Sequence, residues 1–214
     1  MFPHLLLLTL TSQQLFLRGL PIKVQAAPCD EPQYCFSPQG PATLCLGEGP
    51  AQTCYTAPGD HGRDPGAEIV QIDKKTQAIL FQASGSGASA YPIHFALLRQ
   101  TPSGKLENIL PSAFKLSSQS QHRFFNDPSL YATPIFVTAD YHWGLNDSHH
   151  GAHRFFISVY LLQKHLDSGT TKYTLADRFM TRKRYGVVDS DDDILTAEAP
   201  EWKSRLRRVL ESTR

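Results

Sequence analysis

Four of the nine histidines lie within one short stretch, residues 139–153, whose sequence is ADYHWGLNDSHHGAH. Imidazole nitrogens are good ligands for zinc, copper and nickel, and a nearby carboxylate can complete or orient such a site. A bound divalent metal ion could then lower the pKa of a water molecule for hydrolysis. The candidate metal ligands are Asp140, His142, His149, His150 and His153.

The same stretch also has the composition of a structural loop between two strands. It contains two glycines and the turn-prone string Asn-Asp-Ser at 146–148. Asp140 or Asp147 can hold such a loop by accepting hydrogen bonds from an imidazole and from Arg154. No His-Glu-x-x-His helix motif is present, and a serine directly beside a histidine does not make a catalytic triad. We favour the structural loop, keep a site for zinc or another divalent metal and an acid–base catalytic site as the alternatives, and expect no other cofactor.

The elements that position this stretch are predicted to be strands. Short runs rich in aromatic and β-branched residues follow one another along the chain after residue 61. They comprise residues 68–73, 76–83, 91–100, 105–110, 122–125, 133–143, 154–163 and 172–180. Turn signals separate them, as at TPSG, where Pro102 and Gly104 suit a type I turn. This pattern predicts a mainly β domain, an antiparallel β-sandwich or barrel-like fold, over residues 61–214.

One amphipathic helix is predicted near the C-terminal end, over about residues 198–212. Pro200 suits a first helical position, and one apolar stripe follows it. The stripe consists of Trp202, Leu206, Val209 and Leu210. The opposite face is basic, with Lys203, Arg205, Arg207 and Arg208. We expect the stripe to pack on the sheet and the basic face to be solvated.

All four cysteines fall between residues 29 and 54, in a Cys-rich segment predicted to span residues 27–60. An even, clustered set of cysteines beside an export signal is typical of two disulfides. We favour the sequential pairing, Cys29 with Cys35 and Cys45 with Cys54, because glycines and a proline can reverse the chain between the second pair. A zinc site is disfavoured, since no Cys-x-x-Cys spacing is present.

The N-terminal segment indicates export. A leucine-rich run at residues 5–10 precedes the small-residue pattern Val24-Gln25-Ala26, which is typical of a signal peptide over residues 1–26 with cleavage after Ala26 or Ala27. The run is too short and too interrupted for a transmembrane anchor. We therefore expect a secreted or periplasmic protein without a transmembrane segment after signal cleavage.

Charge narrows the choice of partners. The 214 residues contain 21 Lys and Arg against 20 Asp and Glu, a net charge of +1, and 41% are hydrophobic. A balanced charge argues against nucleic acid as a partner. It is compatible with a protein or a small molecule as the partner.

Three functions fit these observations. The first is an exported, non-enzymatic β-rich binding or interaction module whose ligand the sequence does not reveal. The second is a metal-dependent hydrolase that uses the histidine and aspartate cluster at 140–153. The third is a structural envelope component whose basic helix docks on a partner. We favour the first, because no complete catalytic motif is present.

Overall fold

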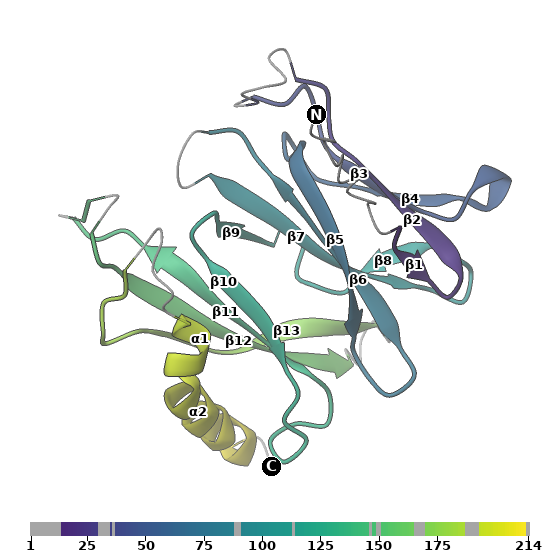
Figure 1. Ribbon diagram of the computed structural model, residues 1–214. Coiled ribbons are helices and arrows are strands. Elements are labelled where there is room, and N and C mark those ends of the chain that lie inside the picture. Colours follow the sequence, from purple (N-terminus) through teal and green to yellow (C-terminus); the bar gives the residue numbers. More distant parts are fainter. Residues whose placement is uncertain are drawn as a thin grey trace, which may run out of the picture.

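The computed structural model describes residues 14–29, 35, 37–87, 91–112, 114–145, 147–148, 151–164, 170–186 and 193–212. These residues form three antiparallel sheets and a C-terminal helix, arranged as successive layers (Figure 1). The prediction of a mainly β, antiparallel fold with one C-terminal helix is confirmed.

The first sheet contains four strands in the order β1-β2-β3-β4. Their bounds are β1 Phe16–Leu17, β2 Leu20–Gln25, β3 Thr43–Leu46 and β4 Thr53–Thr56. A short 3-10 helix, η1 (Gly49–Ala51), joins β3 to β4. Cys45 and Cys54 are direct neighbours across these two strands and form a disulfide, and Cys29 pairs with Cys35. The predicted sequential pairing is therefore confirmed.

The second sheet lies in the middle of the stack and has the order β5-β6-β7-β8, with β9 also paired to β7. Its strands are β5 Arg63–Gln71, β6 Gln77–Ser84, β7 Pro92–Gln100, β8 Leu106–Asn108 and β9 Lys115–Ser117. The predicted turn at TPSG joins β7 to β8, and Gly104 adopts a positive φ of 83° there.

The third sheet has the order β10-β11-β12-β13, and the helices follow it in the chain. Its strands are β10 Gln121–Phe125, β11 Ile135–His142, β12 Arg154–Lys164 and β13 Thr171–Met180, and the helices are α1 Ile194–Ala197 and α2 Ala199–Ser212. Asp193 caps α1 by accepting a hydrogen bond from the backbone amide of Thr196.

Three apolar cores separate the layers. Because side chains alternate along a strand, β6 and β7 each supply residues to two cores. Leu80 and Leu97 pack toward the third sheet, whereas Phe81 and Leu98 pack toward the first. The third core lies between the third sheet and α2, where Trp202 and Leu206 are fully buried.

The basic face of α2 is only partly free for a partner. Lys203 forms an ion pair with Asp127 at 2.9 Å, and Arg205 forms one with Asp177 at 2.6 Å. These contacts tie the helix to the β-rich domain, although surface ion pairs of this kind contribute little free energy each. The prediction that the basic face docks on a partner is not tested by these contacts.

Residues inside the predicted signal peptide belong to the first sheet. Leu17 is fully buried and Ile22 is 6% exposed, in the core shared with β6 and β7. The tight turn between β1 and β2 places Arg18 and Gly19 at positive φ, as a two-residue hairpin turn requires. Cleavage after Ala26 would remove both strands. No helix in the described part of the chain is long and apolar enough to span a membrane.

We predict that deleting residues 1–26 lowers the free energy of unfolding by more than about 4 kcal/mol, because β3 loses its neighbour and two apolar side chains leave the core. Chemical denaturation of this variant checks it, with deletion of residues 1–13 as the matched control. Equal stability of the two variants would show that β1 and β2 are dispensable.

Candidate functional site

The structure divides the predicted histidine and aspartate cluster. Asp140 and His142 share one face of β11, while Tyr141 points to the opposite face and contacts His153. His149 and His150 lie outside the described residues. Among the residues that are described, no group of three or more His, Cys, Asp or Glu is placed to hold a metal ion. The five-residue metal site therefore stays a prediction.

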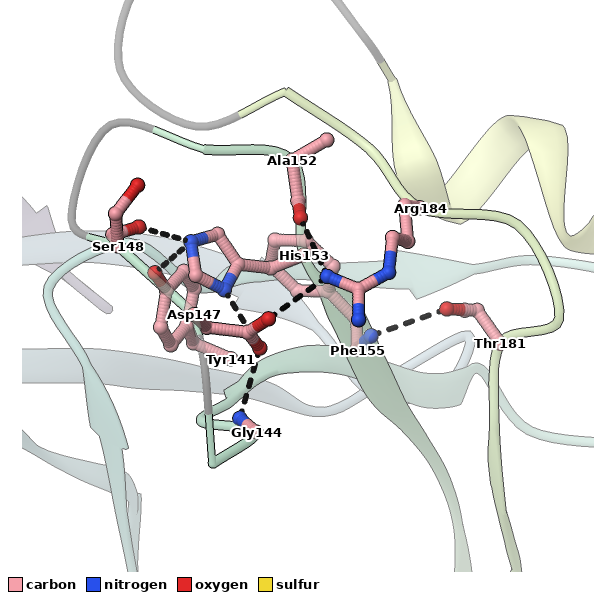
Figure 2. Close-up of polar contacts among 9 residues, drawn as sticks. All are labelled: Tyr141, Gly144, Asp147, Ser148, Ala152, His153, Phe155, Thr181 and Arg184. Atoms are coloured by element: carbon pink, nitrogen blue, oxygen red, sulfur yellow. Dashed lines mark hydrogen bonds and ion pairs between the residues drawn. The ribbon is translucent and has the colours of Figure 1, made fainter.

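His153 is fully buried and both of its ring nitrogens are engaged (Figure 2). Nδ1 lies 3.2 Å from a carboxylate oxygen of Asp147, and Nε2 lies 2.7 Å from the backbone carbonyl of Ser148. The Tyr141 hydroxyl also contacts Nε2. A ring held in this way orders the loop and has no free nitrogen to offer a ligand.

Asp147 is the acceptor that holds this loop together. Its carboxylate accepts hydrogen bonds from the Gly144 amide at 2.7 Å and from Arg184 at 2.7 Å, besides the contact with His153. The Arg184 hydrogen bond, followed by that of Gly144, lowers the pKa of Asp147 to about 2. The expectation that an aspartate holds the loop fits this geometry, but the cation is Arg184, which follows β13, and not Arg154.

We predict that His153→Ala lowers the free energy of unfolding by about 2–3 kcal/mol, because it leaves buried partners unpaired. His142→Ala, on the more exposed face of the same hairpin, should cost less than about 1 kcal/mol. Urea denaturation of both variants checks the difference. An equal, small loss of stability in both variants would show that the hydrogen bonds of His153 do not hold the loop.

We predict that Asp147 makes stability acid-sensitive in a defined window. Its pKa is about 2 in the folded chain and about 4 when unfolded, so its contribution is complete above pH ~4 and is lost as the pH falls through ~2. Asp147→Asn should be less stable at pH 7 and lose less stability between pH 4 and 2. Thermal melts across this range measure the difference, and parallel acid profiles would contradict the assignment.

Asp140 joins the second and third sheets at a different place. One of its carboxylate oxygens accepts a hydrogen bond from the backbone amide of Ser117, at the end of β9, at 3.0 Å. Beside it lies a pocket of about 380 Å³. The pocket is lined by Pro111, Ser112, Phe114, Lys115, Leu116, Thr138, Asp140, Ser158, Tyr160, Leu175 and Arg178. We call this the Thr138 pocket.

The floor of the Thr138 pocket is polar and buried. Thr138 is 1% exposed, and its hydroxyl has no hydrogen-bond partner in the described part of the chain. Ser158 lies directly opposite Thr138 on β12, and Arg178 lies opposite Ser158 on β13, so the three side chains form a row on one face. Burial raises the pKa of Tyr160, which keeps its phenol protonated at neutral pH.

The rim of the Thr138 pocket is cationic and partly apolar. Lys115 and Arg178 are exposed, and the Arg178 guanidinium packs 4.3 Å from the centre of the Phe156 ring. Leu175 is 51% exposed. Two cations face the single carboxylate of Asp140, so the pocket has a net positive charge.

A larger groove of about 970 Å³ lies between β5 and β10. Its lining includes Glu68, Asp73, His122 and Arg123, and Arg123 is engaged with Asp193 at 2.9 Å. None of the lining side chains that the structure describes has a buried polar atom without a partner. The groove therefore lacks the unmet hydrogen-bonding capacity that distinguishes the Thr138 pocket.

Sequence reasoning missed Thr138, Ser158 and Arg178 as site residues. The available signal was the pair of polar residues at alternate positions of the apolar run 135–142, which places Thr138 and Asp140 on one face of a strand. The partners Ser158 and Arg178 depend on strand register, which the sequence did not provide.

Comparison of the chain with models of protein families, with curated proteins and with solved structures found no match in any of the three.

Proposed function

We propose that this chain is an exported, non-enzymatic β-rich binding module that holds a small, hydroxylated organic anion in the Thr138 pocket. The observation that carries the proposal is that Thr138 lines the pocket and that its buried hydroxyl has no hydrogen-bond partner among the residues that the structure describes. A buried hydroxyl left unpaired costs about 1–3 kcal/mol, and a ligand that supplies the missing partner would recover this cost.

The chemistry of the lining defines the class of ligand. Arg178 and Lys115 can bind a carboxylate at the rim, while Thr138 and Ser158 can exchange hydrogen bonds with hydroxyl groups at the floor. Asp140 can accept from a further hydroxyl. A volume of about 380 Å³ is within the range of small-molecule sites. A sugar acid offers a carboxylate and hydroxyl groups together, so we assign an acidic monosaccharide as the ligand class.

Two features support a binding role in an oxidising compartment. The disulfides fit an extracellular or periplasmic location. Among the described lining residues there is no histidine or cysteine that could act as a base or nucleophile in neutral solution. A metal-dependent hydrolase would require the candidate ligands of the 140–153 cluster to converge on one ion. Those ligands that lie in the described part of the chain do not converge.

The test is isothermal titration with galacturonate, galactose and acetate. Galacturonate carries both the carboxylate and the hydroxyls, so it should bind at least about tenfold more tightly than galactose, which lacks the carboxylate, or acetate, which lacks the hydroxyls. Equal affinities for galacturonate and galactose would show that the cationic rim does not contribute to binding. No binding of any probe would reject the proposed ligand class.

Two variants locate the binding. Thr138→Val keeps the shape of the side chain and removes an unpaired hydroxyl, so it should preserve or raise stability while weakening galacturonate about fivefold. Arg178→Gln should weaken it by more than about tenfold. Lys75→Gln, in the turn between β5 and β6, is the matched surface control and should have no effect. Unchanged affinity in Thr138→Val and Arg178→Gln would place the binding elsewhere.

A further inference from the structure

A second polar cluster lies between the first and second sheets, away from the Thr138 pocket. It comprises Tyr55 of β4, His94 of β7 and His61, which precedes β5. The Tyr55 hydroxyl lies 2.9 Å from Nε2 of His94, and the two imidazole rings are 5.7 Å apart between centroids. His94 is 1% exposed, and the His61 side chain is 11% exposed.

A backbone carbonyl holds one of the two imidazoles. Nδ1 of His61 lies 2.8 Å from the carbonyl of Pro58, whereas Nε2 of His94 lies beside the Tyr55 hydroxyl. A carbonyl can only accept, so Nδ1 of His61 donates to it, and in the neutral ring the remaining nitrogen, Nε2, carries a lone pair. This is the arrangement that orients metal-binding histidines in known sites.

The lone pair of His61 has no partner among the described residues. Its Nε2 atom is buried and makes no hydrogen bond within the part of the chain that the structure describes. A buried nitrogen left in this state loses its interaction with water without compensation. Burial, followed by the nearby His61, lowers the pKa of His94 to about 4.

The distances fit coordination of one ion. Two imidazoles that each bind an ion through a nitrogen at about 2 Å have ring centroids roughly 5–6 Å apart, and the observed separation is 5.7 Å. Two ligand atoms 2.9 Å apart, as Tyr55 Oη and His94 Nε2 are, can both lie about 2 Å from an ion at an angle close to 90°.

We propose that His61, His94 and Tyr55 form a copper(II) site, with water completing the coordination. On binding, the Tyr55 phenol loses its proton to solvent, and its oxygen bonds to the ion. Copper(II) is favoured over zinc because nitrogen and oxygen donors bind it more tightly in the order of divalent first-row metals. The site contains two histidines and a tyrosine, and it is independent of the candidate ligands at 140–153 and of the Thr138 pocket.

The test is titration of the intact protein with copper(II), followed by visible absorption and by calorimetry in buffers of different ionisation enthalpy. We expect one ion bound per chain, release of a proton and a phenolate-to-copper charge-transfer band. Zinc should bind more weakly than copper. Absence of binding, or binding without the charge-transfer band, would overturn the proposed ligand set.

Three variants assign the ligands. His61→Ala should weaken copper binding by more than about tenfold. Tyr55→Phe keeps the ring and should abolish the charge-transfer band while thermal melting still shows a folded protein. The double variant His149→Ala, His150→Ala is the control for the loop cluster and should bind like the parent. If the control loses copper while His61→Ala and Tyr55→Phe retain it, the metal belongs to the loop and the proposal is wrong.

Discussion

The middle sheet is buried on both faces, and the rest of the structure depends on this constraint. Phe81 and Leu98 point to one side of the sheet and Leu80 and Leu97 to the other, all nearly inaccessible to solvent. An apolar surface of this kind is stable only when another layer covers each side. The first sheet covers one side, the third sheet covers the other, and α2 then covers the outer face of the third sheet (Figure 1).

The two proposed sites lie at positions where polar side chains interrupt the apolar packing between the layers. On the inner face of the third sheet, Phe136 packs into the core, and Thr138 and Asp140 follow it along β11. Between the first two sheets, His94 takes the place of an aliphatic residue at one end of β7. Polar atoms in such positions are costly unless they find partners. Each site contains one atom, Thr138 Oγ1 or His61 Nε2, that lacks one within the described structure.

Much of the fold could be predicted from the sequence. β-rich runs separated by turns, the stripe containing Trp202 and Leu206, and the clustered cysteines are local signals, and local signals give element type. The layering could not be predicted, because strand pairing and the choice of covering face are long-range. Residues 16–25 form strands but also lie within the predicted signal peptide, which stays a prediction, because an apolar segment that joins a core and one that directs export have similar composition.

The candidate site was harder to predict than the fold. His142 and His153 are close in sequence, but strand alternation and burial separate them, since His153 turns inward to Asp147. By contrast, Tyr55 and His94 are 39 residues apart in the chain and meet only through sheet packing. Proximity in sequence is therefore a poor guide to a site built between layers.

The central claim is that the Thr138 pocket receives a hydroxylated anion. The most direct measurement is a crystal structure of the protein soaked with galacturonate. We predict density for the sugar acid in the pocket, with a hydroxyl within hydrogen-bond distance of Thr138 Oγ1 and the carboxylate at Arg178. A well-ordered pocket that holds only water at saturating galacturonate, or the sugar bound at another surface, would contradict it.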